Sequence, residues 1–441
     1  MIDKLKKLKP GDSFVLGNVH LVDPVAGVNG IKDLHIENGI VKDVMAGGAG
    51  KALEKNGNIA LYLDCAEKTC IPGLVDIHTH LREPGFEYKE SIETGTKAAV
   101  AGGFTSVLCM ANTNPVNDNP YVTKFILAQA KAYSSCKLYP VGALSKGLKG
   151  EQLAEIGKMK DAGAVAISDD GMPVMNTYLM RKALDYCKAF DLPILVHAED
   201  AHLVGQGVMH EGFHSCCLGL RGIPAESEEI MVARDIALAR LTGGRVHFCH
   251  ISAKQSLHHL RRAKEEGLRV TAEVTPHHLH FCDEDVSTYD SNYKMAPPLR
   301  TKEDVEAMRK ALAEGLIDCI ATDHAPHAPR DKEVLFEFAS NGVVGLETAW
   351  MAGVDLVNKK YLSLEALIKS LSVNPAKIVG LKAGTLQKGS PADLFLTDLG
   401  ATHVADNQNM QSRSKNSPFL GKSMQGKVLM TMVDGVCKWI S

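Results

Sequence analysis

The sequence lacks the features that would assign it to a membrane or to nucleic acid. No apolar run approaches the roughly 18 residues that a membrane-spanning helix needs, and the first residues, up to Pro10 and Gly11, lack the apolar stretch of a secretory signal. The formal net charge is only -3 over 441 residues, so the composition contains no excess of basic residues for binding nucleic acid. We therefore expect neither a membrane partner nor a nucleic-acid partner.

Closely spaced cysteine pairs are also absent. The chain has 11 cysteines, an odd number, and no Cys-x-x-Cys motif. Several of them, including Cys109, Cys249 and Cys319, lie inside apolar runs. Reduced, buried thiols explain this pattern better than a disulfide framework or a cysteine-ligated metal does. The sequence therefore predicts a cytoplasmic protein.

The middle of the chain alternates short β-branched runs with stretches of helical character. Hydrophobic residues make up 45% of the chain and charged residues 23%, the balance of a globular protein with a large core. Near-continuous apolar runs separated by amphipathic helices are typical of a parallel sheet buried on both faces. Eight such units favour a (β/α)₈ TIM barrel over an open sheet, and no Gly-x-Gly-x-x-Gly turn follows the first run. The expected strands are residues 73–77, 105–110, 138–144, 164–168, 193–196, 245–249, 270–274 and 318–321, and the expected helices include 121–133, 180–190, 226–242, 255–266 and 302–314.

Both ends of the chain have a different pattern, with short strand-like runs between glycine-rich turns. Such runs occur at residues 14–16 and 33–36, and again at residues 392–396 and 427–430. We expect residues 1–71 and 385–441 to form a small β-sandwich domain together. Residues 72–384 would form the barrel between them.

Histidines and aspartates follow the predicted barrel strands at their carboxyl ends, where TIM barrels carry their active sites. In the first strand, His78 and His80 alternate with Thr79, so both imidazoles face the same side. A single buried histidine is more often structural than a ligand. Four histidines and two carboxylates at five strand ends, however, favour a metal site. The other candidates at strand ends are Asp169 or Asp170, His197, His250 and Asp323.

This set of side chains indicates the kind of metal centre and its chemistry. Imidazole nitrogens and carboxylate oxygens suit Zn²⁺, and Mn²⁺ or Co²⁺ could substitute for it. Six ligands are too many for one tetrahedral ion and suit two Zn²⁺ ions per chain, provided that one carboxylate bridges them. The other carboxylate could then transfer a proton. We therefore predict a metal-dependent hydrolase that cleaves an amide-like bond.

Several motifs resemble those of a known family. The segment Pro-Gly-Leu-Val-Asp-Ile-His-Thr-His-Leu-Arg-Glu-Pro-Gly at residues 72–85 resembles the amidohydrolase-superfamily signature in its dihydroorotase form. Motifs at residues 111–115, 167–171, 247–252, 297–300 and 322–327 follow in the order typical of class I bacterial dihydroorotases, and residues 384–394 resemble the return into the terminal domain. The resemblance implies the reversible cyclisation of N-carbamoyl-L-aspartate to L-dihydroorotate, a step of pyrimidine (UMP) biosynthesis.

The resemblance also implies a role for each metal ligand. His78 and His80 would bind the first metal and His197 and His250 the second. Asp170 would bridge both metals; we prefer it to Asp169 because its distance along the chain from His197 matches the family, and we assign Asp169 a supporting hydrogen bond. Asp323 would ligate the first metal and act as general acid and base. Hydantoinases and allantoinases bridge their metals with a carboxylated lysine instead, and no lysine ends this strand.

A second group of residues is expected to bind the substrate. Arg82 lies two residues after His80 and could hold a carboxylate through its planar guanidinium. An ion pair at the surface for Arg82 and a turn role for Asn112 are the structural alternatives. Ala296 stands where many class I enzymes have asparagine, so a side-chain contact with the substrate is lost there. By resemblance, the substrate-binding set is His80, Arg82, Asn112, Ala296, His327, and the backbone of Asn341 and Gly342.

The expected partner is a small-molecule substrate. We also expect a homo-oligomer and consider an association with aspartate transcarbamoylase. Two alternative functions remain open at this stage. One is a related cyclic amidase, a hydantoinase or allantoinase, and the other is a non-catalytic dihydroorotase-like partner of aspartate transcarbamoylase.

Overall fold

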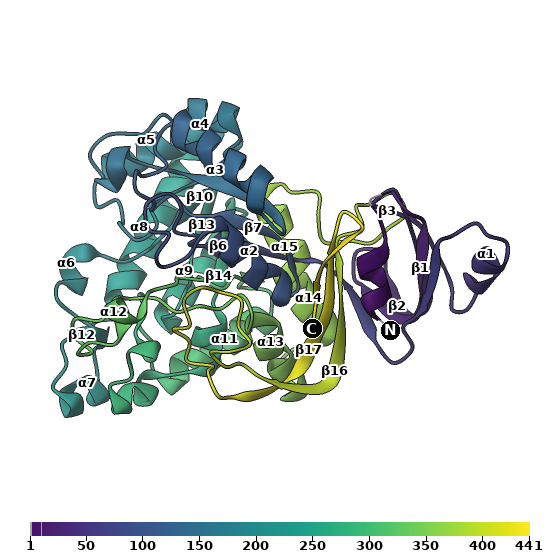
Figure 1. The fold of residues 1–441 in the computed structure, drawn as a ribbon. Helices are drawn as coiled ribbons and strands as arrows, with labels where there is room; N and C mark the ends of the chain where they lie inside the picture. Colours follow the sequence, from purple (N-terminus) through teal and green to yellow (C-terminus); the bar gives the residue numbers. More distant parts are fainter. Residues whose placement is uncertain (1, 10) are drawn as a thin grey trace.

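The chain, described here by a computed structural model over residues 2–9 and 11–441, forms a helix-covered barrel beside a sheet built from both chain ends (Figure 1). The barrel holds the middle of the chain. The terminal sheet holds its beginning and its end, so the two termini lie in the same part of the molecule.

Eight parallel strands form the barrel, in the order in which they occur along the chain. A parallel bridge between Thr79 and His324 brings the segment after the last strand back to the first one. The predicted (β/α)₈ barrel is therefore confirmed. The strands are β6 (Leu74–Thr79), β7 (Phe104–Cys109), β8 (Lys137–Ala143), β9 (Ala166–Ser168), β10 (Ile194–Val196), β13 (Val246–Phe248), β14 (Val270–Val274) and β15 (Cys319–Ile320).

Helices cover the outside of the barrel, and several begin where the sequence supplies a cap. The Asn119 side chain accepts hydrogen bonds from the backbone N–H groups of Tyr121 and Val122, just after Pro120, and Thr301 forms a capping box with Asp304. The main helices are α2 (Ile92–Ala101), α3 (Pro120–Tyr133), α4 (Ile156–Ala162), α5 (Thr177–Lys188), α8 (Glu226–Thr242), α9 (Lys254–Glu265), α11 (Lys302–Ala313) and α13 (Ala349–Asn358). Shorter elements are α6 (Ala201–Val204), α7 (Phe213–Leu218), α10 (Pro276–His280), α12 (Pro329–Lys332), α14 (Leu364–Ile368), the π-helical turn Lys369–Val373, α15 (Asn374–Val379), the 3₁₀ turns Lys146–Leu148, Asp283–Thr288 and Ser291–Tyr293, and the strand pair β11 (Met209–His210) and β12 (Gly222–Ile223).

Alternate residues of the barrel strands fill two different cores. Leu108 belongs to the cluster inside the barrel, whereas its neighbours Val107 and Cys109 pack in the layer between strands and helices. Cys249 and Cys319 lie inside the barrel. These three cysteines are buried thiols outside any disulfide, as the sequence predicts.

The terminal strands form one mixed sheet in which the two ends of the chain interleave. Strand β5 pairs parallel with β1 from the N-terminal part and antiparallel with β16 from the C-terminal part. Leu394 and Leu396 of β16 face the core of this sheet, and Phe395 between them faces the barrel helices. The elements are the 3₁₀ turn Ile2–Lys7, β1 (Phe14–Asp23), β2 (Val28–Glu37), β3 (Ile40–Ala46), α1 (Lys51–Lys55), β4 (Leu61–Asp64), β5 (Thr69–Pro72), β16 (Leu394–Val404), β17 (Ser423–Val433) and β18 (Val436–Ile440).

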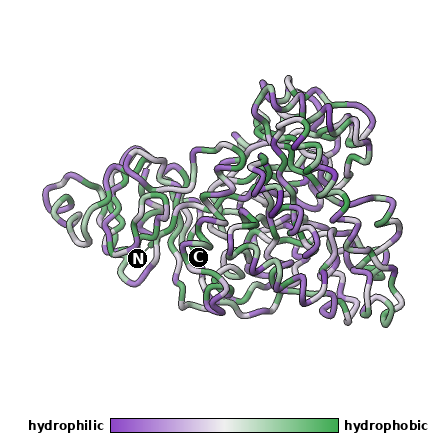
Figure 2. Tube along the Cα trace, turned by 180° about the vertical axis from the view of Figure 1, so that it is seen from behind, coloured by the Kyte–Doolittle hydropathy of each residue, from purple (hydrophilic) through white to green (hydrophobic). Residues whose placement is uncertain are grey.

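The terminal strands are longer than the sequence indicates, because their pairing continues through polar residues. The domain boundaries after residues 71 and 384 stay a prediction. Hydrophilic and hydrophobic segments alternate along the trace in both parts of the molecule (Figure 2). Among the described residues, no helix combines the length and hydropathy needed to cross a membrane.

Candidate active site

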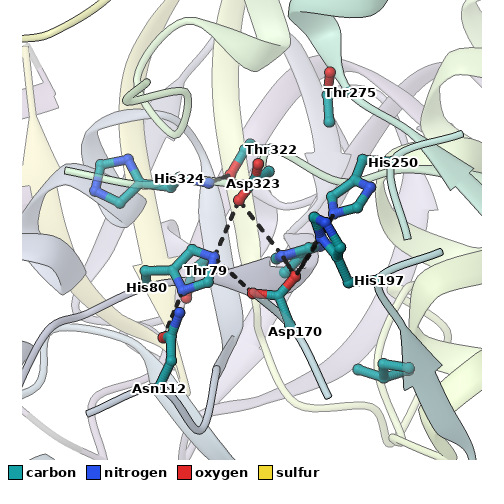
Figure 3. A network of polar contacts seen from close by, with 12 residues as sticks. Thr79, His80, Asn112, Asp170, His197, His250, Thr275, Thr322, Asp323 and His324 are labelled. Atoms are coloured by element: carbon teal, nitrogen blue, oxygen red, sulfur yellow. Dashed lines mark hydrogen bonds and ion pairs between the residues drawn. The ribbon is translucent and has the colours of Figure 1, made fainter. Parts of the chain in front are cut away.

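Asp170 lies at the centre of a cluster of four buried imidazoles at the carboxyl ends of the barrel strands (Figure 3). Its Oδ1 is 3.3 Å from His78 Nε2 and 3.6 Å from both His197 Nδ1 and His250 Nε2. Its Oδ2 is 3.3 Å from His80 Nε2. One carboxylate thus faces all four histidines that the sequence singles out.

Asp323 faces the same cluster from the segment after β15. Its Oδ1 is 3.1 Å from His80 Nε2 and 3.4 Å from His78 Nε2. Burial alone would raise the pKa of Asp323, but the imidazoles of His78 and His80 outweigh this effect and hold the pKa below its usual range. All six predicted ligands are therefore brought together.

Three of the imidazoles have one ring nitrogen engaged by a neighbour outside the cluster. His78 Nδ1 is 2.6 Å from Glu273 Oε1, His80 Nδ1 is 2.8 Å from Asn112 Oδ1, and His197 Nε2 is 3.0 Å from Glu199 Oε2. Since these oxygens accept the ring N–H, the other nitrogen of each ring presents its lone pair to the cluster. That is the orientation that a metal ligand requires.

The cluster passes a test for metal binding that does not depend on any relative. His78 Nε2 is fully buried and has no hydrogen-bond partner among the described residues. A buried, unpartnered lone pair is costly unless something fills the space before it. Donor atoms of His78, His80 and Asp323, and those of His78, Asp170 and His250, lie within 4.8 Å of one another in each set. Imidazole and carboxylate donors at this spacing fit a divalent cation such as Zn²⁺.

Only one of these three partners, Asn112, is predicted from the sequence, and it is assigned to the substrate. Glu273 and Glu199 are found from the structure alone. Glu273 lies in β14, a buried apolar strand, and is 0% exposed. A carboxylate in the middle of such a strand is the sequence signal that would have identified it. Asp169 has the supporting role that we expect, because it accepts a hydrogen bond from the His197 backbone N–H at 3.0 Å.

Three site residues have strained backbones. Arg82, His250 and Asp323 have φ values of 61°, 34° and 46°, in the left-handed region that side chains other than glycine rarely adopt. Each such conformation costs on the order of 1–3 kcal/mol and persists only where the surroundings enforce it. The barrel therefore holds these side chains in place against a local preference.

A cavity of about 590 Å³ opens above the cluster. Every residue that we expect to bind substrate lines it, from His80 and Arg82 to Asn341 and Gly342. Arg82 Nε donates to the Pro326 carbonyl at 3.1 Å, which fixes the guanidinium at the cavity wall. Ala296 is also in the wall, but its methyl group offers no hydrogen bond.

His327 lies beside Arg82 and is held as a neutral imidazole. Its Nε2 donates to the Asn341 carbonyl at 2.8 Å, and its Nδ1 is 3.2 Å from Lys89 Nζ. Burial, with Arg82 and Lys89 close by, lowers the pKa of His327 to about 2. This end of the cavity therefore places the cationic Arg82 beside a neutral imidazole, and the guanidinium suits a bound carboxylate.

The segment after β9, the fourth barrel strand, shows whether an aspartate or a lysine faces the histidine cluster. Lys158 and Lys160 lie on α4, outside the barrel, and Lys158 forms an ion pair with Glu155 at 2.7 Å. The side chain that faces the histidines is the Asp170 carboxylate. Neither lysine of α4 takes its place.

Comparisons with known proteins agree with this geometry. The family model described as "Amidohydrolase family" matches residues 69–437. Dihydroorotase from Anaeromyxobacter dehalogenans is 49% identical over 424 residues, covering 96% of each chain. Dihydroorotase from Syntrophus aciditrophicus is 48% identical over 422 residues, covering 96% of this chain and 98% of that protein.

Solved structures share the fold over almost the whole chain. L-hydantoinase from Arthrobacter aurescens superimposes with a TM-score of 0.86 at 27% identity, covering 97% of this chain and 96% of that one. Dihydropyrimidinase from Brevibacillus agri superimposes with a TM-score of 0.81 at 21% identity, covering 96% of this chain and 94% of that one. At this identity the similarity concerns the fold alone. The barrel and its buried histidine–aspartate cluster define a hydrolase with a metal site of the amidohydrolase type. Within the amidohydrolase family, the chain belongs to the dihydroorotases.

Proposed function

We propose that the protein catalyses the reversible ring closure of N-carbamoyl-L-aspartate to L-dihydroorotate, in pyrimidine (UMP) biosynthesis. The observation that carries this proposal is the pairing of the histidine–aspartate cluster with a carboxylate-binding wall in one cavity. Relatives named dihydroorotase that are 48–49% identical over 96% of the chain support it.

The same cluster supports a centre of two Zn²⁺ ions, with Mn²⁺ or Co²⁺ as substitutes. His78, His80 and Asp323 would hold one ion and His197 and His250 the other, with Asp170 shared. When bound, such ions polarise a carbonyl group and make water a nucleophile near neutral pH.

The chain's own residues bind the substrate and move the proton. Arg82 and the Asn112 amide would hold the substrate carboxylate, with His327 lining the same end of the cavity, and the backbone of Asn341 and Gly342 would bind the ring amide. Because Asn112 Oδ1 already contacts His80, its Nδ2 is the group that can reach the substrate. Asp323 would take a proton from water during ring opening and deliver it to the ring nitrogen.

Substitution of Asp323 tests this assignment. Asp323→Asn keeps the shape but cannot accept the proton, so we expect kcat on L-dihydroorotate to fall by about 10²- to 10⁴-fold. Asp398→Asn is a matched control, because that aspartate pairs with Lys68 on the terminal sheet. Full activity of Asp323→Asn with bound metal would remove Asp323 from the mechanism.

Rates on other cyclic amides distinguish the main alternative. Arg82, Asn112 and the aspartate in place of a bridging lysine argue against a hydantoinase or allantoinase. A faster rate on hydantoin or allantoin than on dihydroorotate would overturn the proposal.

Metal analysis distinguishes the non-catalytic alternative. Roughly two zinc ions per purified chain support the enzyme, and a metal-free, inactive chain supports a scaffold for aspartate transcarbamoylase. Homo-oligomerisation and association of the active enzyme with that transferase also stay predictions. Light scattering of the protein alone, and mixed with the transferase, measures both.

A further inference from the structure

The segment between β16 and β17, residues 405–422, extends from the terminal sheet across the barrel (Figure 1). We call it the C-terminal excursion. Its backbone is anchored by two barrel carboxylates: the Gln411 and Ser412 N–H groups donate to Glu347 at 3.0 Å, and the Arg413 N–H donates to Glu90 at 3.1 Å. The excursion is thus fixed to the barrel at the active-site end.

Asn416 is the residue of the excursion that reaches the cavity wall. It is 6% exposed. Its Oδ1 accepts from the His327 backbone N–H at 3.0 Å, and its Nδ2 donates to the carbonyls of Ala325 at 3.2 Å and Gly342 at 3.0 Å. Its own carbonyl accepts from the Val344 N–H at 2.8 Å. One side chain therefore joins the segment after β15 to the segment around Gly342.

Both joined segments line the cavity, and they pack against each other closely. A Cβ added to Gly342, whose φ is +126°, would lie 2.7 Å from the Ala325 Cβ. The separation of the two segments therefore has little freedom while Asn416 holds them. His327 and Asn341, which connect through a 2.8 Å hydrogen bond, lie on opposite sides of this junction.

Lys332 also forms hydrogen bonds to the segment around Gly342. Its buried Nζ donates to the carbonyls of Gly342 and Ser340, each at 3.0 Å, and to that of Lys294 at 3.2 Å. The Gly342 carbonyl therefore has two side-chain donors. Loss of Asn416 alone would loosen the wall without releasing it.

We propose that Asn416 is a positioning residue for substrate recognition. Together with the backbone hydrogen bond from the Ala325 N–H to the Val343 carbonyl at 2.8 Å, it holds the His327 and Gly342 segments in register, so the substrate-binding wall depends in part on a residue of the C-terminal excursion. The inference rests on the proposed function, because that function assigns these segments to dihydroorotate binding. It does not involve the metal ligands.

An isosteric substitution tests it. Asn416→Asp keeps an acceptor for the His327 N–H but places a carboxylate oxygen against the two carbonyls that the amide nitrogen contacts. We expect KM for L-dihydroorotate to rise by about 10- to 100-fold. The change in kcat should be smaller, and the zinc content should equal that of wild type. Asn409→Asp is the matched control: Asn409 is exposed in the same excursion and bonds only within residues 404–411, so its KM should not change.

Three results separate this inference from the proposed function. A wild-type KM in Asn416→Asp, or a loss of zinc in parallel with activity, would overturn the positioning role. If Asn416→Asp does not fold, Asn416→Ser, which introduces no buried charge, decides by the same KM measurement. Wild-type protein without activity on dihydroorotate would refute the proposed function itself.

Discussion

Glu273 shows how one buried carboxylate can orient a metal-binding imidazole. Its Oε1 is 2.6 Å from His78 Nδ1 and its Oε2 is 2.9 Å from His247 Nε2. His247 Nδ1 extends this hydrogen-bond network to Thr271 Oγ1 at 2.8 Å. Burial alone would raise the pKa of Glu273, but the charges and hydrogen bonds of His78 and His247 lower it to about 2. The ionised carboxylate thus holds the proton of His78 on Nδ1 and leaves Nε2 for the cluster.

Removing the charge of Glu273 should weaken metal binding. We expect Glu273→Gln to lower zinc affinity by about 10- to 100-fold, the usual effect of losing such a partner. Competition with a chromophoric chelator measures it. Glu228→Gln is a suitable control, because Glu228 is an equally buried carboxylate whose partners are Ser252, Ala253 and Ser256. Equal zinc affinity in Glu273→Gln and wild type would contradict this role.

At the scale of the element, the helices around the barrel follow their sequence signals more closely than the strands of the terminal sheet do. Helix α8 has the predicted bounds, 226–242, and α11 begins at the predicted Lys302 behind its Thr301 cap. Helix caps are local, since the side chain and the N–H group that it satisfies are three residues apart. The ends of β1 and β16, by contrast, depend on partners far along the chain.

The small β11–β12 pair makes a pH-dependent contribution to stability. His210 in β11 is 7% exposed, and its Nδ1 is 3.4 Å from the buried Arg300 guanidinium. Burial, together with Arg300, lowers the pKa of His210 to about 4. A base with a lowered folded pKa binds fewer protons when folded than when unfolded, so the free energy of unfolding falls as pH falls from about 6.5 towards 4.

Replacing His210 should remove that component. In His210→Gln we expect stability to decline less than in wild type between pH 7 and pH 5, by at most about 2 kcal/mol. Urea denaturation at several pH values measures the difference. His258→Gln, at an exposed position of α9, should keep the wild-type slope. A wild-type slope in His210→Gln would show that His210 is not the source.

At the scale of the whole molecule, the barrel and the terminal sheet share a core. Trp350 on α13 is 0% exposed, its ring centroid lies 5.0 Å from that of Phe395 in β16, and its Nε1 donates to Thr397 at 3.1 Å. Val428 and Val433 of β17 belong to the same cluster as the barrel helices. Damage to this contact should therefore affect both parts.

The second tryptophan reports on that coupling. Trp350→Ala and Trp350→Phe each leave Trp439, in β18, as the only tryptophan of the chain. Loss of the large buried ring costs about 3–5 kcal/mol, so we expect Trp439 fluorescence to change at a lower temperature in Trp350→Ala than in Trp350→Phe. Identical transitions of Trp439 in the two variants would mean that the terminal sheet unfolds independently of α13.

The sequence by itself determined the class of fold and the identity of the candidate ligands. Eight alternating units predict the barrel because a strand buried on both faces must be apolar along its length. Alternation in His78-Thr79-His80, and the rule that parallel strands end at one face, predict that the six candidate ligands converge. These inferences need only local periodicity and chain direction.

Only the tertiary structure decided how those ligands are supported. Glu273 and Asn112 orient the imidazoles across separations of 195 and 32 residues, and Asn416 reaches Ala325 across 91. A hydrogen bond depends on angles and on distances of about 3 Å. Contacts between distant residues therefore leave no spacing rule in the sequence, because the folded chain alone brings them together.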